Sequence, residues 1–457
     1  MFLDLDKKDR AALAVIDDSG EQLSYGEICD FSAEFGRQLP ARSLIFLLAE
    51  NRIGSLLGYT ASLTNRVVPL ILSAKTEAGL YEHLRDLYRP AYLWAPEEMD
   101  FPYEIVFRAH GYVLRKTGFD PVPLYEELSM LLPTSGSTGS PKLVRHSYRN
   151  IEANADNVRR LFGLTADERA MAVLPMHYTM GLSVISSHLL AGATLLLSGR
   201  SLLDRGFWAM LKEATSFTGV PYSYELLMKM RFTRMDLPKL RIITQGGGKL
   251  TPELFQALAQ YAHDKGKRFI ATYGQSECTA RMAYLPAELA LEKTCSIGFA
   301  EPGGQLSIVD ADGVETFEGE ASGEMVYRGE NVTLGYAYGP EDLLKGDENH
   351  GIRYTGDLAR RDADGCYFII GRLGRFLKIF GLRIGLDEVE NLIKQEFKAD
   401  CYCKGDDERL VVLVTDPALV EALPAFIEDK THLFHKNIEV RLVDAILRNE
   451  AGKVINQ

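Results

Sequence analysis

Short apolar runs alternate with amphipathic stretches along most of the chain, up to about residue 300. Residues 53–63 and 77–88 repeat their apolar positions with the 3.6-residue period of a helix. The short apolar runs that fit buried strands are residues 43–50, 67–73, 103–107, 171–176, 193–198, 240–247 and 269–274. Strands that alternate with helices predict a mainly parallel sheet with helices on both of its faces.

The pattern changes after about residue 300. Gly residues, turn pairs and alternating apolar residues become frequent, as is typical of hairpins in an antiparallel sheet. A final helix, strand, helix and strand are predicted at residues 386–397, 408–416, 417–430 and 438–443. We therefore predict an α/β protein with two domains. The large N-terminal domain, residues 1–372, has layered parallel sheets with helices plus an antiparallel β subdomain, and residues 373–457 form a small α+β domain.

The composition is that of an ordinary globular protein, with 46% hydrophobic and 25% charged residues among 457. A formal net charge of -12 argues against a general nucleic-acid-binding protein, because phosphate backbones require a basic surface. The N-terminus has no apolar core of signal-peptide length, and the longest apolar runs are too short to span a membrane. Six cysteines without a C-x-x-C pair indicate reduced thiols, no zinc and a cytoplasmic location, and Cys401 and Cys403 would share one face of a strand.

A loop rich in Ser, Thr and Gly follows the predicted strand LSMLLP at residues 128–133. The loop residues that could contact a phosphate are Thr134, Ser135, Gly136, Ser137, Thr138, Gly139 and Lys142. Glycine lets the backbone approach an anion closely, while hydroxyl groups, backbone N–H groups and a lysine supply hydrogen bonds and charge. Lys142 comes three positions after Gly139 and no Ser or Thr follows it, which disfavours the P-loop of a kinase or GTPase. Taken alone, the stretch also fits a flexible hairpin.

The segment TSGSTGSPK, residues 134–142, resembles the ATP phosphate-binding loop of the adenylate-forming (AMP-binding) superfamily, most of all that of acyl- and aryl-CoA synthetases. The superfamily also includes adenylation domains of peptide synthetases and luciferases. Seven further segments are similar to its motifs and follow in order: MHYTMGL (176–182), GGGKLTPEL (246–254), YGQSE (273–277), GEMVYRGENVTLGY (323–336), YTGD (354–357), GRLGRFLKIFGLRIGLDEVE (371–390) and NEAGK (449–453). One such motif would be weak evidence, but this many in register along nearly the whole chain are very specific.

The resemblance implies a ligase that activates a carboxylic acid. The acid's carboxylate attacks the α-phosphorus of ATP in the presence of Mg²⁺, pyrophosphate leaves, and the acyl group then passes from acyl-AMP to a thiol. Coenzyme A is the expected acceptor, and the phosphopantetheine arm of a carrier protein is the alternative. A nucleotide-binding protein without turnover is a third possibility, which the presence of Lys453, Glu277 and Asp357 disfavours. Two anions meet in the first step, so charge neutralisation and alignment would dominate the barrier.

The resemblance also assigns roles around the phosphates and the base. Glu277 would bind Mg²⁺, with Thr138 as a second ligand, and Ser276 would donate a hydrogen bond to the α-phosphate. Taken alone, Glu277 is equally a solvated loop carboxylate. The residues implied around adenine are Tyr273, which would stack on the base, and Gly274, Gly246, Gly247 and Gly248.

Further roles concern the ribose, the acyl group and the tail of the chain. Asp357 would accept hydrogen bonds from both ribose hydroxyls and Arg372 would reach the ribose or the phosphates, although T-G-D alone also fits a simple turn. His177 would be a gate beside the acyl pocket, or else a core histidine. Lys453 would bridge the substrate carboxylate and the α-phosphate as a catalytic residue, which requires a mobile C-terminal domain. The hinge position, which usually carries Asp or Lys, is Gly374 here, so rotation remains compatible with the backbone.

The substrate side of the sequence is less informative. Residues 176–190 contain no acidic side chain that would hold the ammonium group of an amino acid, and a buried charge without a partner is unfavourable. An amino acid substrate is therefore disfavoured. The H-x-x-x-G-L form of the segment favours a fatty or aromatic acid.

Overall fold

The structure is a computed structural model that describes residues 1–133, 142–379, 382–406, 408–448 and 454. The chain separates into two compact units. The first unit contains Met1–Gln305 and Tyr327–Arg353, and the second contains Leu306–Val326 and Tyr354–Gln457. In the described residues, no helix combines the length and the apolar character needed to cross a membrane.

The larger sheet of the first unit has nine strands in the order β16-β15-β14-β13-β12-β10-β11-β1-β2. These strands are β1 (Leu13–Asp17), β2 (Gln22–Ser24), β10 (Arg169–Ala172), β11 (Thr194–Leu197), β12 (Ser216–Gly219), β13 (Ile242–Gln245), β14 (Arg268–Tyr273), β15 (Ala283–Tyr284) and β16 (Phe299–Ala300). The strands from β14 to β1 in this order are parallel, whereas β2, β15 and β16 pair antiparallel at the two edges. The parallel arrangement predicted from the sequence is confirmed in this sheet.

The second sheet of this unit has eight strands in the order β20-β9-β8-β4-β3-β5-β7-β6. They are β3 (Leu44–Ala49), β4 (Val68–Ser73), β5 (Tyr92–Pro96), β6 (Glu104–Ala109), β7 (Tyr112–Lys116), β8 (Leu128–Pro133), β9 (Leu143–Ser147) and β20 (Gly335–Ala337). β3 pairs parallel with β4 and β5, and β4 with β8, while the remaining pairs are antiparallel. The prediction of a buried strand at 103–107 was wrong. β6 is an edge strand with only one neighbour, so Ile105 remains 42% exposed.

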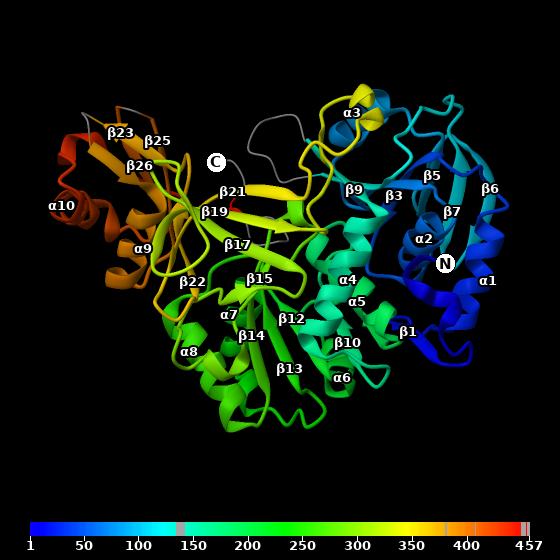
Figure 1. Cartoon of the computed structure of the whole chain (residues 1–457), viewed down its shortest axis with the longest axis horizontal. Coiled ribbons are helices and arrows are strands. Elements are labelled where there is room, and N and C mark those ends of the chain that lie inside the picture. The colour runs from blue at the N-terminus through cyan, green and yellow to red at the C-terminus, as the bar shows by residue number, and fades with distance from the viewer. Residues whose placement is uncertain (134–141, 380–381, 407, 449–453, 455–457) are drawn as a thin grey trace. The chain divides into compact units, whose positions relative to one another are not determined.

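Helices lie between and outside the two sheets, as Figure 1 shows. They are α1 (Tyr25–Phe35), α2 (Ile53–Thr64), α3 (Ala78–Tyr88), α4 (Tyr148–Phe162), α5 (Thr179–Ala191), α6 (Arg205–Glu213), α7 (Pro221–Lys229) and α8 (Pro252–Asp264). Ile45 and Leu47 of β3 share one core with α1, α2, α4 and α5 and with Leu195 of β11, so these helices fill the space between the sheets. Leu44 and Phe46 point to the opposite face, which α3 covers.

The outer face of the nine-stranded sheet is covered by α6, α7 and α8. Phe207, Tyr224 and Phe255 from these helices pack with Phe217 and Ile243 from the strands in a separate core. The first unit therefore has five layers, which alternate between helices and sheets. α2 lies inside this stack and is buried on all sides from Ile53 to Leu63, as expected for a helix that is apolar all round.

The second unit begins with most of a five-stranded sheet in the order β18-β17-β19-β21-β22. Its strands are β17 (Gly304–Val309), β18 (Glu315–Thr316), β19 (Ala321–Gly329), β21 (Ile352–Arg361) and β22 (Tyr367–Arg372). β17 pairs antiparallel with β18, and β21 with β22. The antiparallel subdomain predicted after residue 300 is confirmed.

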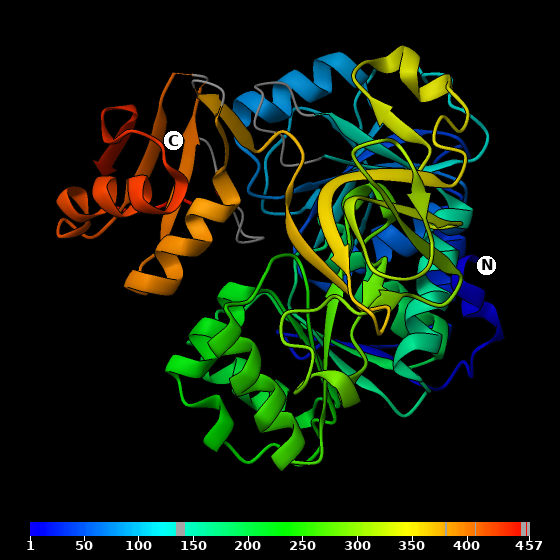
Figure 2. The same ribbon diagram turned by 60° about the vertical axis from the view of Figure 1, so that its left-hand side comes forward.

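The rest of the second unit is a small α+β fold, drawn in orange and red in Figure 2. It contains β23 (Phe376–Ile379), β24 (Leu382–Gly385), α9 (Leu386–Phe397), β25 (Cys401–Gly405), β26 (Leu410–Val414), α10 (Leu419–Thr431) and β27 (Ile438–Leu442). Its core joins Ile393 of α9, Leu423 of α10 and Val412 of β26. Cys401 and Cys403 are buried in the same core, as their spacing on a strand predicts. This confirms the small C-terminal α+β fold.

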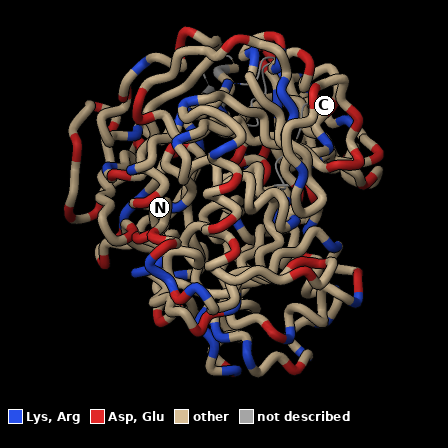
Figure 3. The backbone as a smooth tube through the Cα atoms, turned by 90° about the vertical axis from the view of Figure 1, so that its right-hand side faces the viewer, with Lys and Arg blue, Asp and Glu red and all other residues tan. Residues whose placement is uncertain are grey.

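Six short 3-10 helices complete the described structure: η1 (Phe2–Lys7), η2 (Phe232–Arg234), η3 (Ser276–Cys278), η4 (Ala287–Leu289), η5 (Pro340–Leu344) and η6 (His435–Asn437). Acidic and basic residues are interspersed along the backbone in the view of Figure 3. All six cysteines are free thiols.

Candidate active site

Glu277 lies just beyond the carboxyl end of β14, in η3. The carboxyl ends of parallel strands form the edge where α/β proteins usually bind ligands. The loop turns back sharply here, because a Cβ atom at Gly274 would lie 1.4 Å from the carbonyl oxygen of Ala280. Thr279 and Ala280 have φ angles of 53° and 100°, which residues other than glycine rarely adopt. The loop that carries Glu277 is thus strained, and surrounding residues must hold it.

Two residues between β19 and β20 and one residue of β20 hold this loop, and we call Asn331, Thr333 and Tyr336 the clamp. The backbone N–H and the hydroxyl of Thr333 both donate to the carbonyl oxygen of Glu277, each at 3.0 Å. Asn331 Nδ2 donates at 3.0 Å to the carbonyl oxygens of Cys278 and Arg281. The Tyr336 hydroxyl donates to Glu277 Oε1 at 2.5 Å. The clamp therefore fixes both the backbone and the side chain of Glu277.

The charge of Glu277 is set by its neighbours rather than by burial. Burial raises the pKa of the Glu277 carboxyl, but the Tyr336 hydrogen bond and the guanidinium of Arg353, 3.7 Å away, outweigh it, so the pKa is lowered overall. Arg353 also donates to Gln275 Oε1 at 3.3 Å. The carboxylate is therefore ionised at neutral pH and held in one orientation.

Lys142 lies beside this carboxylate through the pairing of two strands. β9 begins directly after Lys142 and pairs antiparallel with β20, with Val144 opposite Tyr336. The Lys142 ammonium nitrogen is 3.8 Å from the centre of the Tyr336 ring, a cation–π distance. The structure thus brings together Lys142 and Glu277, two predicted site residues far apart in the chain, around one tyrosine.

Ser276 and His177 are linked through the first turn of α5. The hydroxyl oxygens of Ser276 and Thr179 are 3.4 Å apart, and Thr179 begins α5 two residues after His177. The His177 ring contacts that of Tyr178, with centroids 4.4 Å apart. Burial, aided by Lys75, lowers the pKa of His177 to about 4, so its imidazole is neutral at pH 7.

The predicted adenine-facing residues lie at the ends of β13 and β14. Gly247 has a φ of +76°, and a Cβ atom at Gly246 would lie 2.5 Å from the methyl carbon of Met180. Glycine at 246 is thus needed for close packing against Met180. Tyr273 is partly buried, and its hydroxyl accepts a hydrogen bond from Gln275 at 3.2 Å.

Asp357 and Arg372 lie opposite each other on β21 and β22 of the second unit. Arg372 Nε is 3.3 Å from Asp357 Oδ1. Thr355 and Gly356 are held by hydrogen bonds to Met325 and Glu324 of the same unit. The T-G-D segment is therefore part of a strand that fixes an acid and a base together, and not a simple turn.

Some predicted site residues lie outside the described residues. These are Thr134, Ser135, Gly136, Ser137, Thr138, Gly139 and Lys453. In the described part of the chain, no group of three or more His, Cys, Asp or Glu residues could hold a metal ion by itself.

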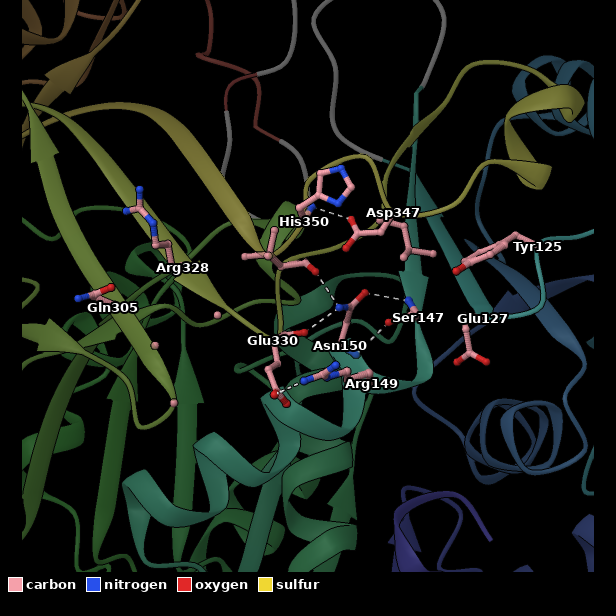
Figure 4. Close-up of a pocket in the computed structure, with 16 residues that line it drawn as sticks. Tyr125, Glu127, Ser147, Arg149, Asn150, Gln305, Arg328, Glu330, Asp347 and His350 are labelled. Atoms are coloured by element: carbon pink, nitrogen blue, oxygen red, sulfur yellow. Dashed lines mark hydrogen bonds and ion pairs between the residues drawn. The ribbon is translucent and has the colours of Figure 1, made fainter. Parts of the chain in front are cut away.

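A wide surface cavity, with about 1470 Å³ of empty space, has Ser147, Asn150 and Glu330 among its lining residues (Figure 4). The described residues predicted for the site do not line it. Arg149 and Glu330, which both line it, form an ion pair with each other. Asn150 Nδ2 donates at 2.7 Å to the carbonyl oxygens of Glu330 and Val332, on either side of Asn331. Asn150 therefore fixes the backbone on both sides of Asn331, which is part of the clamp.

Sequence reasoning missed the clamp and Arg353. The motif GEMVYRGENVTLGY contains Asn331, Thr333 and Tyr336, but no role followed for them from the sequence. Their side chains are polar at positions buried or partly buried between two strands, and this was the available signal. Arg353 directly precedes YTGD and carried no such signal.

Comparison with known proteins identifies the family of this chain. Residues 5–337 match the family described as AMP-binding enzyme. The indoleacetate–CoA ligase of Aromatoleum aromaticum is 31% identical over 363 residues, which cover 75% of this chain and 69% of that protein. The oxalate–CoA ligase of Arabidopsis thaliana is 31% identical over 274 residues, or 58% of this chain and 52% of that protein. The matches thus span between about half and two thirds of these relatives.

Solved structures show the same fold. The o-succinylbenzoate CoA synthetase of Bacillus subtilis in complex with AMP has a TM-score of 0.80 at 19% identity, covering 99% of this chain and 96% of that one. ATP-bound MatB from Rhodopseudomonas palustris has a TM-score of 0.76 at 20% identity, covering 99% and 96%. The predicted α/β architecture is confirmed. With the match over residues 5–337, these findings show that the chain belongs to the family of AMP-binding enzymes.

Proposed function

We propose that this chain is an ATP-dependent acid–thiol ligase. It activates a carboxylic acid as acyl-AMP, releases pyrophosphate and transfers the acyl group to coenzyme A. The observation that carries the proposal is the ionised Glu277 carboxylate, fixed by the clamp at the carboxyl end of β14 beside Lys142. The CoA-ligase names of the relatives favour coenzyme A over the phosphopantetheine of a carrier protein.

Glu277 fits a magnesium ion that is shared with a nucleotide. A single carboxylate is a hard oxygen donor, and Mg²⁺ in such sites is bound by one or two carboxylates plus phosphate oxygens and water. We propose Glu277 and Thr138 as the protein ligands. Bound Mg²⁺ would neutralise charge on the phosphates, and Tyr336 would keep the carboxylate oriented toward it.

The remaining residues bind the nucleotide and align the acid. The Thr134–Gly139 loop and Lys142 bind the phosphates, and Ser276 donates to the α-phosphate. Tyr273 stacks on adenine beside the glycines at 246–248 and Gly274, while Asp357 and Arg372 bind the ribose. Neutral His177 borders the path of the acyl group.

The second step needs the tail of the chain to move. We propose that residues 373–457 act as a lid that carries Lys453 toward the carboxylate and the α-phosphate and later withdraws it. Gly374 supports this role, because its φ is +82° and a Cβ atom there would meet nothing within 4 Å. The acid oxygen bonds to the α-phosphorus as pyrophosphate leaves, and the thiol sulfur then bonds to the acyl carbon as AMP leaves. The free thiols of all six cysteines support a cytoplasmic setting.

The test is acid-dependent exchange of labelled pyrophosphate into ATP. A panel of fatty, aromatic and dicarboxylic acids is assayed for exchange, and the active acids are then assayed for thioester formation with coenzyme A and with a holo carrier protein. We expect exchange with at least one acid and a coenzyme A thioester as product. The absence of exchange with every acid would contradict the proposal, and thioester only on the carrier would move the acceptor to that protein.

A further inference from the structure

Arg145 is a fully buried arginine of β9, the strand that pairs with β20. Its exposure is 0%, which is rare for an arginine, because a buried charge is unfavourable unless polar groups surround it. Arg145 lies opposite Gly335 of β20, the residue before Tyr336. The same strand begins directly after Lys142. The guanidinium therefore belongs to the strand pair that brings Lys142 to the clamp tyrosine.

All three guanidinium nitrogens of Arg145 donate hydrogen bonds. Nε donates to the carbonyl oxygen of Tyr336 and Nη2 to that of Leu334, each at 3.0 Å. These two carbonyl groups belong to the residues on either side of Gly335. The guanidinium has five N–H groups in one rigid plane, and it meets five acceptors here. The acceptors are the carbonyl oxygens of Leu334, Tyr336, Lys345 and Gly346 and the carboxylate of Glu348.

Gly335 lets this ion pair approach the backbone of β20. Its φ is +124°, and a Cβ atom there would lie 2.7 Å from Glu348 Oε2 and 3.0 Å from Arg145 Nη2. A side chain at position 335 would therefore displace the ion pair. An arginine, an acid and a glycine are thus matched to one another directly beside Tyr336.

β20 needs support from a side chain because it is short and lies at the edge of its sheet. It has three residues, and β9 is its only neighbouring strand in the described part of the chain, whereas strands usually have about five or six residues. The Tyr336 hydroxyl of this strand nevertheless donates to Glu277 Oε1 at 2.5 Å. A shift of β20 would break that hydrogen bond.

We infer that Arg145 is a positioning residue that holds Tyr336 where its hydroxyl orients the Glu277 carboxylate. Arg145 acts through the backbone of β20, whose carbonyl oxygens accept its hydrogen bonds. The inference rests on the proposed function, in which Glu277 binds the magnesium ion of the nucleotide, and it adds a residue to that site. Residues that orient a metal ligand typically change metal affinity by about 10- to 100-fold when they are replaced.

The experiment measures the affinity for ATP by calorimetry, once at saturating Mg²⁺ and once in excess chelator. The quantity compared is the factor by which Mg²⁺ strengthens ATP binding. Arg145→Lys keeps the buried charge but loses the planar set of donors, so this factor should fall by about tenfold. Tyr336→Phe should lower the factor as well. Because both substitutions act through one hydroxyl, adding Arg145→Lys to Tyr336→Phe should lower it further by less than about twofold.

Arg361→Lys is the matched control. Arg361 is 5% exposed, and its Nε donates at 2.6 Å to the carbonyl oxygen of Gly319, within the second unit. This variant also loses buried hydrogen bonds to the backbone, but in a different sheet from β20. It should leave the magnesium factor unchanged.

Hydrogen–deuterium exchange of the free protein gives a readout that needs neither metal nor nucleotide. The Thr333 N–H donates to the Glu277 carbonyl oxygen, next to the Leu334 carbonyl group that Arg145 holds. This N–H should exchange about fivefold faster in Arg145→Lys, as expected for the loss of one hydrogen bond. Its exchange in Arg361→Lys should match the wild type.

A second variant keeps the inference falsifiable if Arg145→Lys does not fold. The Glu348 side chain is 47% exposed, so Glu348→Gln should fold, and it removes the charge that pairs with Arg145. It should lower the magnesium factor by about threefold. Glu439→Gln is its control, because it removes the charge that pairs with Arg409 in the second unit, and should leave the factor unchanged.

An unchanged magnesium factor in folded Arg145→Lys, or in Glu348→Gln, would overturn the inference and leave Arg145 a role in stability alone. Equal losses in Arg145→Lys and Arg361→Lys would overturn it too, and so would losses that add fully in the double variant. If Mg²⁺ does not strengthen ATP binding even in the wild type, unchanged exchange of the Thr333 N–H in Arg145→Lys would overturn it. The absence of pyrophosphate exchange with every acid would overturn the proposed ligase, whereas ATP binding and deuterium exchange would still decide the role of Arg145.

Discussion

Glu277 and Glu301 are two carboxyl groups of the first unit that Asn331 connects, and their pKa values move in opposite directions. Asn331 Nδ2 donates to Glu301 Oε1 at 2.8 Å and also holds the backbone of the Glu277 loop. Burial raises the pKa of both groups. At Glu277, the Tyr336 hydroxyl and the Arg353 guanidinium outweigh burial. At Glu301, the hydrogen-bond donors are neutral and burial dominates.

The comparison shows that two carboxyl groups connected by one asparagine differ in charge. The ionised Glu277 is held by a clamp whose hydrogen bonds are made within the protein, so it is preorganised for a cation. Burial raises the pKa of Glu301 to about 8, so that carboxyl is mostly protonated at pH 7 and accepts a hydrogen bond from the neutral Asn331 amide. Burial alone does not decide the charge of an acid; the partners that share its site decide it.

The largest expected effect is on pyrophosphate exchange, and it distinguishes the two acids because the same substitution is made at each of them. Glu277→Gln keeps the shape of the side chain but removes its charge, and should lower pyrophosphate exchange by about 1000-fold. Glu301→Gln is the matched control, because Glu301 is already mostly neutral at pH 7, and exchange should stay within about threefold. Exchange rates at saturating Mg²⁺ and ATP measure both. Equal losses in the two variants would contradict the assignment of the charged role to Glu277.

The second prediction concerns Asn331, which donates hydrogen bonds both to Glu301 and to the loop that carries Glu277. Asn331→Leu removes the donors to Cys278, Arg281 and Glu301, and should lower the free energy of unfolding by about 3 kcal/mol, because buried acceptors lose their partners. Urea denaturation measures the change. Asn437→Leu, where one side-chain hydrogen bond to Glu408 is lost at an exposed site, should cost less than about 1 kcal/mol. Equal destabilisation would mean that Asn331 does not hold the strained loop.

Much of the fold could be predicted from local patterns. Strands such as 67–73 and 193–198 are continuous apolar runs because both faces of their sheets are covered. α9 begins and ends at Leu386 and Phe397, where its amphipathic period predicts. The exposure of β6 could not be predicted, since an edge position depends on which strands pair across the chain. The local pattern predicts whether a segment forms a helix or a strand, whereas long-range strand pairing decides where a strand lies in its sheet.

The candidate site shows the same difference between local motifs and long-range contacts. Glu277, Ser276 and the Asp357–Arg372 pair lie in short motifs that can be recognised in sequence, and the structure keeps Asp357 and Arg372 paired. The clamp could not be predicted, because Tyr336 acts on Glu277 across 59 positions. The burial of Arg281, which is 1% exposed, could not be predicted either, because a single arginine in a sequence is far more often exposed than buried.

A smaller effect appears in the pH dependence of stability. The pKa of Glu301 is raised in the folded protein from an ordinary value near 4.5 to about 8. The stability that it contributes is therefore full below about pH 4.5 and is lost as the pH rises through 8. Wild-type protein should lose about 2 kcal/mol between pH 6 and pH 9 relative to Glu301→Gln, whose side chain cannot ionise. Urea denaturation at both pH values checks this, and parallel losses in the two proteins would show that Glu301 is ionised when buried.

The smallest effect tests the hydroxyl that orients Glu277. Tyr336→Phe removes the hydrogen bond that lowers the pKa of Glu277, so this pKa should rise. The carboxylate must be ionised to act, so the acid limb of the kcat/KM profile should move to higher pH, with a loss of about tenfold near that limb. Any stability that depends on the ionised carboxylate is lost as the pH falls through the folded pKa, and should now be lost at a higher pH.

The control for this prediction lies two residues further along the chain. Tyr338→Phe removes a hydroxyl from a side chain that is 66% exposed, and should leave the acid limb in place. Arg353 remains in the Tyr336→Phe variant and still lowers the pKa of Glu277, which is why the effect is smaller than that of Glu277→Gln. If the acid limb did not move in Tyr336→Phe, Arg353 alone would keep Glu277 ionised. The difference between the two acids would then come from the guanidinium and not from the clamp.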